Sequence, residues 1–291
     1  MLYSGIIIDM KNILITGGTG FFANAFTKHL LNNNLSERIC IYSRDEHKQA
    51  LMRQKFNDDK RLRFFIGDVR DQERLTRAMH GVDTVIHTAA LKRIEACYYN
   101  PDECVKTNVH GAMSVINSSM DAGVNKVIAL STDKAFNPVS VYGYSKAMAE
   151  ALFIAANNIS GSFGPRFSAC RYGNIWNSTG SIVPKWKALI EQGSNKVPVT
   201  DPECTRFFMT IEEAVDLVLN TLETMQGGEI AIPDLPAYRV GDLVEAMGVT
   251  ADVIGLPKLE KLHESMRDGE SSNSARRMSI DELKEALRAT L

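Results

Sequence analysis

The sequence predicts an α/β protein with a doubly wound parallel sheet and a smaller C-terminal region. Up to about residue 171, short apolar runs rich in β-branched residues alternate with longer amphipathic stretches. This alternation is typical of parallel strands covered by helices on both faces of a sheet. Beyond residue 173 the rhythm breaks into a stretch rich in turn-forming residues, 174–181, so we expect the smaller region to begin there.

Each expected element follows from its residue pattern. Continuous apolar runs predict buried strands at 13–15, 39–42, 62–66, 84–86, 126–130 and 166–171. Amphipathic stretches predict helices at 23–31, 46–56, 70–79, 102–120 and 141–157. In the C-terminal part we expect a helix at 211–225, a strand at 229–232 that returns to the main sheet, and a closing helix from 280 to about 287.

Composition and charge exclude several classes of protein. Hydrophobic residues make up 44% and charged residues 23% of the 291 residues, which is typical of a globular protein. A formal net charge of −2 offers no basic surface for nucleic acid or an anionic membrane. No apolar run is long enough to span a bilayer, and the run 5–8 is too short for the core of a signal peptide. Residues 10–12 resemble an alternative start of the chain. We therefore expect the first nine residues to contribute little to the fold or the function.

The cysteines point to a reducing compartment. The chain has five of them, Cys40, Cys97, Cys104, Cys170 and Cys204. Their spacing fits neither a zinc site nor a disulfide framework. We therefore expect reduced thiols, no metal site and a cytoplasmic location.

A glycine-rich turn, Thr-Gly-Gly-Thr-Gly-Phe-Phe-Ala at 16–23, lies between the first expected strand and the first expected helix. Glycines let the backbone turn tightly and approach a pyrophosphate, which the helix N-terminus then binds. Ala23 replaces the third glycine of the usual fingerprint and is tolerated there. An ordinary tight turn is the alternative, but the position after the first strand favours a Rossmann-like dinucleotide site. Its expected residues are Gly17, Thr19, Gly20, Phe21 and Phe22.

The end of the second strand indicates which dinucleotide is bound. Ser43 and Arg44 precede Asp45 there. A hydroxyl and a guanidinium suit a 2′-phosphate, which favours NADP, while Asp45 keeps NAD as the less favoured alternative. Arg44 could equally lie on a solvated turn. Asp68 and Val69, after the third strand, could contact the adenine or form a common turn.

The glycine turn assigns roles to the two parts of the chain. Residues 1–173 are expected to form the NADP-binding Rossmann domain, with 207–232 returning to it. Residues 174–206 and 233–291 are expected to form the substrate-binding region. No linker is long enough to separate the two as independent domains.

Five polar side chains follow the fifth expected strand: Thr132, Asp133 and Lys134 directly, and Tyr142 and Lys146 at the start of the next helix. The last two are four apart and therefore share one helix face. A neighbouring ammonium favours the phenolate, so we expect a lowered pKa that makes Tyr142 a base near neutral pH. Lys146 could also hold the nicotinamide ribose, and Thr132 could bind the same substrate oxygen as Tyr142. A Tyr-x-x-x-Lys pair occurs by chance on many helices, but the upstream glycine turn favours catalysis.

The glycine turn and the Tyr142/Lys146 pair resemble the extended short-chain dehydrogenase/reductase family. Further segments are similar to the inverting UDP-N-acetylglucosamine 4,6-dehydratases of pseudaminic acid biosynthesis. These segments are 42–46, 64–71, 89–92, 129–135 and 171–174. Ser-Thr-Asp-Lys-Ala at 131–135 is the most specific, since sugar epimerases of this fold usually lack the Asp-Lys pair.

The resemblance implies a redox cycle in which the cofactor ends as it began. Tyr142 would take the proton of the sugar 4-hydroxyl while hydride passes from C4 to NADP. Lys134 would then remove the C5 proton, and Asp133 would help the C6 hydroxyl leave as water. Hydride return and reprotonation from the opposite face would give a UDP-4-keto-6-deoxy-L-arabino-hexose. Burial would raise the pKa of Asp133 and Lys134 would lower it, a conflict that the sequence leaves open; a surface ion pair is the alternative for both residues.

The resemblance also implies binding residues and two departures. Cofactor contacts extend to Ala89, Ala90 and Lys92, and substrate contacts to Lys92, Asn174, Arg206, His263 and Glu264. Arg206 would hold phosphate oxygens through its guanidinium. However, Leu-Pro-Lys-Leu at 256–259 replaces Arg-Pro-Gly, and Asn-Ser-Thr-Gly at 177–180 replaces Gly-Ser-Arg-Gly. The chain therefore lacks two cations that its relatives carry in the substrate-binding half.

Other functions remain open at this level. Another UDP-sugar 4,6-dehydratase or a 4-epimerase would share the fold, although an epimerase needs no base at C5. A non-catalytic NADP-binding regulatory protein would belong to a different class. The expected partner is a UDP-sugar, with no nucleic acid or membrane. The resemblance also implies a homo-oligomer, a dimer or larger, with its interface on helices 102–120 and 141–157.

Overall fold

The main sheet of the computed structural model has seven parallel strands in the order β10-β6-β5-β4-β1-β2-β3. The structure describes residues 10–289, so the expectations for residues 1–9 lie outside it. The strands are β1 (Asn12–Thr16), β2 (Arg38–Ser43), β3 (Leu62–Ile66), β4 (Thr84–His87), β5 (Lys126–Leu130), β6 (Arg166–Cys170) and β10 (Ile230–Ala231). Their order reverses direction between β1 and β4, as in a Rossmann-like sheet. The predicted fold class is confirmed, as is the strand at 229–232.

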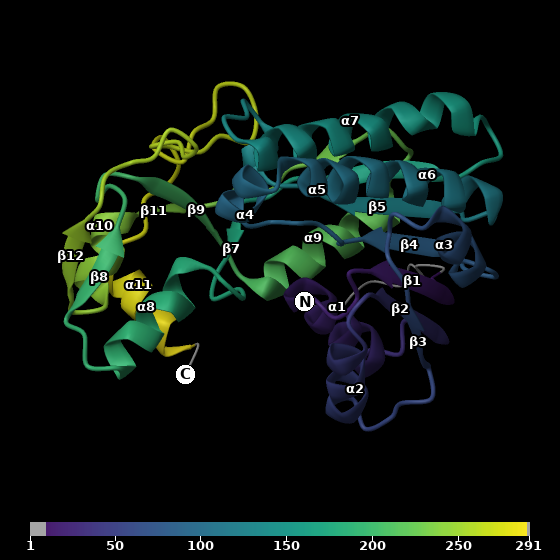
Figure 1. Ribbon diagram of the computed structural model, residues 1–291, viewed down its shortest axis with the longest axis horizontal. Helices are drawn as coiled ribbons and strands as arrows, with labels where there is room; N and C mark the ends of the chain where they lie inside the picture. The colour runs from purple at the N-terminus through teal and green to yellow at the C-terminus, as the bar shows by residue number, and fades with distance from the viewer. Residues whose placement is uncertain (1–9, 290–291) are drawn as a thin grey trace.

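Helices cover both faces of this sheet (Figure 1). One core joins Ile13 and Ile15 to α1 (Phe21–Asn32), α2 (Glu46–Lys55) and α9 (Ile211–Thr224). The intervening Leu14 belongs to a second core, which contains residues of α3 (Gln72–Ala78), α6 (Gly111–Asp121) and α7 (Val141–Ser160). Successive side chains of a strand point to opposite faces, so β1 is apolar throughout because it is buried on both sides.

Two of the predicted helices differ in detail. The helix expected at 70–79 begins only at Gln72, because the Asp71 carboxylate accepts the Arg74 backbone N–H at 3.0 Å and caps the helix. The helix expected at 102–120 is α5 (Pro101–Val105), a π-helical turn (Lys106–His110) and α6 in succession. A short helix, α4 (Ile94–Tyr99), precedes them and was not predicted.

The C-terminal region has its own sheets and core. A three-stranded sheet contains β7 (Asn174–Ile175), β9 (Thr205–Met209) and β11 (Ala237–Arg239), and β8 (Lys196–Val199) pairs with β12 (Thr250–Val253). The helices are α8 (Ile182–Glu191), α10 (Val240–Ala246) and α11 (Ile280–Arg288). Trp176, Trp186, Leu243 and Leu283 are buried together among them. The division of the chain into cofactor-binding and substrate-binding parts stays a prediction.

A buried arginine joins the two parts of the fold. Arg171, just beyond β6, donates to Glu150 of α7 through Nε at 3.0 Å and through Nη2. Its Nη1 donates to the backbone carbonyl of Met266 in the C-terminal segment. Both side chains are buried, so each charge depends on the other. No helix among residues 10–289 is long and apolar enough to cross a membrane.

Candidate active site

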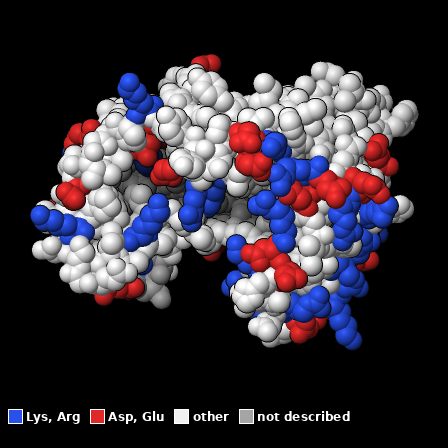
Figure 2. All heavy atoms as spheres, in the orientation of Figure 1, with Lys and Arg blue, Asp and Glu red and all other residues white. Residues whose placement is uncertain are grey.

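A cavity of about 810 Å³ lies between the carboxyl ends of the main-sheet strands and the C-terminal region. Figure 2 shows it as a hollow between the two parts of the molecule, with Lys and Arg side chains on its walls. The loops after β1, β4 and β5 form one wall, and the segment after β7 forms part of the other. A crevice at this edge is where open parallel sheets bind ligands.

The glycine turn after β1 packs closely against the loop after β4 and borders the cavity. Gly17 has φ of +64°, and a Cβ there would lie 2.8 Å from the backbone of Ala89. The helix α1 begins at Phe21 with no side-chain cap on its free N–H groups, which makes its N-terminus suited to an anion. The expected cofactor residues all line the cavity, namely Gly17, Thr19, Gly20, Phe21, Phe22, Ser43, Arg44, Asp68, Val69, Ala89, Ala90, Lys92, Tyr142 and Lys146.

The groups at the end of β2 are already partly engaged. The Arg44 guanidinium is mostly exposed and lies 3.7 Å from the Asp68 carboxylate. Asp45 caps α2 by accepting the Lys48 backbone N–H at 3.0 Å, and this hydrogen bond lowers the pKa of the Asp45 carboxyl. The Ser43 hydroxyl accepts a hydrogen bond from the Gln49 amide at 3.0 Å.

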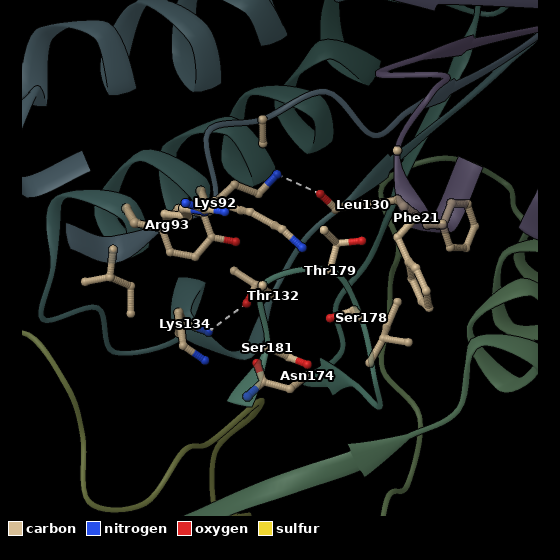
Figure 3. A pocket seen from close by; sticks show the side chains of 18 of the residues that line it. Phe21, Lys92, Arg93, Leu130, Thr132, Lys134, Asn174, Ser178, Thr179 and Ser181 are labelled. Atoms are coloured by element: carbon tan, nitrogen blue, oxygen red, sulfur yellow. Dashed lines mark hydrogen bonds between the residues drawn. The ribbon is translucent and has the colours of Figure 1, made fainter. Parts of the chain in front are cut away.

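Tyr142 and Lys146 reach the cavity from the first turns of α7, as their spacing predicts. Lys146 donates from Nζ to the backbone carbonyl of Leu130 at 2.7 Å (Figure 3). The lowered pKa expected for Tyr142 is wrong in this structure. Burial raises the pKa of Tyr142 to about 12, although the Lys134 charge and the Thr132 hydroxyl act against it. Burial also lowers the pKa of Lys146 to about 8.

Lys134 lies between two buried carboxylates. Its Nζ is 3.1 Å from Oδ1 of Asp133 and 3.3 Å from Oε1 of Glu264. Lys261 lies 2.9 Å from the other oxygen of Glu264. Asp133 is 0% exposed and Glu264 2%, so the alternative of a surface ion pair is wrong.

The pKa values of this cluster follow from burial and charge. Burial opposes the charge of Lys134, but Asp133 and Glu264 outweigh it and raise the pKa of its ammonium. Burial raises the pKa of Asp133, and the Lys134 charge only partly offsets it. Burial alone would raise the pKa of Glu264, yet Lys134, Arg206 and Lys261 lower it to about 2. The conflict over Asp133 is therefore resolved in favour of a raised pKa.

Asp133 lies behind Thr132 and does not itself line the cavity. Thr132 and Lys134 line the cavity, whereas Asp133 is not among the lining residues. The Thr132 hydroxyl donates to Oδ1 of Asp133 at 2.9 Å. A proton leaving Asp133 for the cavity can therefore pass through Thr132.

The expected substrate residues divide into two groups. Lys92, Asn174, Arg206 and Glu264 line the cavity. Arg206 is buried, 3.4 Å from the Glu260 carboxylate, and also donates to the Leu262 carbonyl. His263 does not line the cavity. Its Nδ1 instead lies 2.9 Å from the hydroxyl of Thr205, which is also absent from the cavity wall.

Sequence reasoning missed several polar residues on the cavity wall. These are Arg93, Ser178, Thr179, Ser181, Lys185 and Lys261. Lys261 lies two residues before the expected binding residue His263, so its position gave a signal. Arg93 follows the expected binding residue Lys92, which is a weaker signal. Among residues 10–289 no group of three or more His, Cys, Asp or Glu side chains could hold a metal.

Comparison with known proteins gives a family model and relatives that match most of this chain. A family model described as "polysaccharide biosynthesis protein" matches residues 13–284. An inverting UDP-N-acetylglucosamine 4,6-dehydratase of Campylobacter jejuni is 51% identical over 265 residues, which cover 90% of this chain and 79% of that protein. A UDP-glucose 4-epimerase of Rickettsia prowazekii is 42% identical over 240 residues, covering 81% of this chain and 70% of that protein.

Solved structures share the fold. The X-ray structure of Pen from Bacillus thuringiensis matches with a TM-score of 0.91 and 30% identity, over 98% of this chain and 100% of that one. The dTDP-glucose 4,6-dehydratase DesIV from Streptomyces venezuelae, with NAD and TYD bound, has a TM-score of 0.80. It is 22% identical and covers 95% of this chain and 96% of its own, so this likeness concerns the fold alone.

The lowered pKa of Glu264 predicts a pH-dependent contribution to stability. A carboxyl whose pKa falls on folding stabilises the protein above its unfolded pKa, and this contribution is lost as the pH drops toward the folded pKa. Its window therefore runs from about 4.5 down to about 2. We expect Glu264→Gln to lower the unfolding free energy at pH 7 by up to roughly 3 kcal/mol, and by less at pH 3.5.

Urea denaturation of the wild type and of Glu264→Gln, each at pH 7 and at pH 3.5, measures this difference in unfolding free energy. Glu191→Gln is the control, since Glu191 is exposed at the end of α8. A cost of Glu264→Gln that is equal at pH 7 and pH 3.5 would contradict the assigned pKa.

Proposed function

The chain belongs to the polysaccharide biosynthesis protein family, and we propose that within it the protein is an inverting UDP-N-acetylglucosamine 4,6-dehydratase. The observation that carries the proposal is the identity of 51% to such an enzyme over 90% of the chain. The cavity agrees with this activity, since Tyr142, Lys146, Thr132 and Lys134 all line it. The substrate is accordingly a UDP-sugar.

The first step that we propose uses Tyr142 as the base at the sugar 4-hydroxyl. A bound nicotinamide dinucleotide would supply the hydride acceptor and donor of the cycle. The raised pKa of Tyr142 means that the phenol holds its proton in the free protein. The Lys134 charge and the Thr132 hydroxyl already lower that pKa in part, and both groups line the same cavity. They would help to stabilise the phenolate that proton removal requires.

The second step uses Asp133 and Lys134 as one unit. Moving a proton from the Lys134 ammonium to the Asp133 carboxylate, over 3.1 Å, gives an amine and a carboxylic acid. Both products are neutral, so burial that penalises the two charges does not penalise them. The amine can then remove the C5 proton, and the acid can protonate the departing C6 hydroxyl through Thr132.

A 4-epimerase is the second candidate, because the Rickettsia relative of that name is 42% identical. An epimerase needs the hydride chemistry of Tyr142 but no base at C5. The buried Asp133–Lys134 unit has no task in that reaction, although burying two charges is costly. This unit therefore favours dehydration.

Turnover in deuterated water separates these functions. Purified protein incubated with UDP-N-acetylglucosamine should give a 4-keto-6-deoxy product with deuterium at C5 and the L-arabino configuration, followed by NMR. The Lys134→Met variant should lose dehydration while binding the dinucleotide as tightly as the wild type. A 4-epimer alone would favour the epimerase, and no turnover of any UDP-hexose would favour the NADP-binding regulatory protein. Full activity of Lys134→Met would remove Lys134 from its role.

For the cofactor we propose NADP rather than NAD. Asp45 is committed to capping α2, so it is less available for a ribose hydroxyl. Arg44 is mostly exposed at the cavity and pairs only loosely with Asp68, at 3.7 Å. A guanidinium in this position suits a 2′-phosphate.

Arg44→Ala tests this preference. We expect it to weaken NADP binding by about tenfold or more, because a charge-assisted hydrogen bond is lost, and to leave NAD binding unchanged. Fluorescence or calorimetric titration with both dinucleotides measures the change, with Arg53→Ala on α2 as the control. Equal losses for NADP and NAD would contradict a 2′-phosphate contact.

We also propose a homo-oligomer, formed through α6 and α7. Met113 on α6 and Tyr144 and Met148 on α7 are exposed apolar side chains. Figure 2 shows the surface above α7 largely without charged side chains. Burial of such a face against a second copy would stabilise an assembly.

Sedimentation measures the assembly. We expect the wild type to sediment as a dimer or larger particle, and Met148→Lys to shift it toward the monomer because a charge would enter the apolar contact. Ile254→Lys, at an exposed apolar residue in the C-terminal region, should change nothing. A monomeric wild type would overturn the proposal.

We propose a cytoplasmic location as well. The five cysteines are buried free thiols, which supports this location. Disulfides in the purified protein would argue against it.

A further inference from the structure

Most cations on the cavity wall lie within 4 Å of a carboxylate. Arg44 lies near Asp68, Lys48 near Asp45, Arg206 near Glu260, and Lys134 and Lys261 near Glu264. Lys146 is engaged with the Leu130 carbonyl. Of the described lining residues, this leaves Lys92, Arg93 and Lys185 as cations whose side chains have no carboxylate within 4 Å and no hydrogen bond.

The Arg93 side chain reaches the segment before α8, which contains Thr179 and Gly180. A Cβ on the neighbouring Gly180 would be 3.8 Å from Nη2 of Arg93 and 3.9 Å from its Nε. The guanidinium thus comes from the loop after β4 and reaches the segment before α8, and Figure 3 shows Arg93 and Thr179 in the same pocket.

The surroundings of Arg93 also suit an anion. Lys185 lines the cavity from the start of α8. Ser181 precedes this helix without capping it, and its hydroxyl oxygen is buried with no hydrogen-bond partner among the described residues. Two free cations, an unused hydroxyl and uncapped helix N–H groups therefore face one space.

We propose that Arg93, assisted by Lys185, binds the diphosphate of the sugar nucleotide beside the segment that precedes α8. The inference rests on the proposed function, because it takes the ligand to be a nucleoside diphosphate sugar. The planar guanidinium of Arg93 binds two phosphate oxygens, and the Lys185 ammonium adds a point charge. Arg93 thereby holds the substrate across the two parts of the fold while leaving the Lys134 cluster intact.

Calorimetric titration with UDP, and with uridine as the ligand without phosphate, tests this role. Arg93→Ala should weaken UDP binding by at least about tenfold and Lys185→Gln by a smaller factor, while uridine binding stays unchanged, because charge-assisted hydrogen bonds are lost. Adding Thr179→Arg to Arg93→Ala should restore much of the affinity for UDP. Lys258→Gln is the control, since Lys258 lies in the other altered segment and does not line the cavity.

Each outcome bears on one proposal. UDP binding that is unchanged in Arg93→Ala, with NADP binding and thermal stability also unchanged, would overturn the role of Arg93. Loss of UDP binding that Thr179→Arg does not restore would overturn the placement of the diphosphate beside this segment. A wild type that binds no UDP would instead contradict the proposed substrate class, and a wild type that binds UDP without turnover would contradict the proposed reaction alone.

Discussion

The buried ammonium of Lys134 is the interaction on which the site depends. It lies between Asp133, which follows β5, and Glu264, which comes from the C-terminal segment. Without this cation two carboxylates would be buried close together in a medium that screens charge poorly. Its position therefore sets how the C-terminal segment approaches the sheet edge. The same contacts hold the Asp133–Lys134 unit in one geometry before any ligand arrives, which is the preorganisation that proton transfer needs.

The parallel sheet explains why distant segments meet at this edge. All strands of the main sheet point their carboxyl ends toward the cavity, so the glycine turn after β1, Lys92 after β4 and Thr132 after β5 converge there. The two apolar cores make the strands rigid. The Arg171–Glu150 pair then ties the end of β6 to α7, the helix that carries Tyr142. The packing of these elements thus holds the residues that carry the reacting groups at one edge of the sheet.

How far the sequence predicts this molecule depends on the kind of signal. Strands such as 126–130 are found because burial on both faces leaves a continuous apolar run. The six-residue α4 and the two-residue β7 are too short for any periodicity to show. The direction of the pKa shift of Tyr142 depends on burial by residues far along the chain, which a four-residue spacing does not reveal. His263 was expected at the site because it is adjacent to Glu264, but only Glu264 lines the cavity. Neighbouring side chains of an extended segment point to opposite sides, and His263 contacts Thr205 instead.

Charge balance connects catalysis to substrate binding. A sugar nucleotide brings a diphosphate whose negative charges need local cations, since the whole chain carries a formal net charge of −2. Recruiting Lys134 for this purpose would strip Asp133 and Glu264 of their shared counter-ion and disturb the proton transfer that we assign to the pair. Arg206 is similarly committed to Glu260 and to the Leu262 carbonyl. A site that keeps its catalytic charges balanced must therefore hold the diphosphate with other cations, and Arg93 and Lys185 are placed to do so from opposite walls of the cavity.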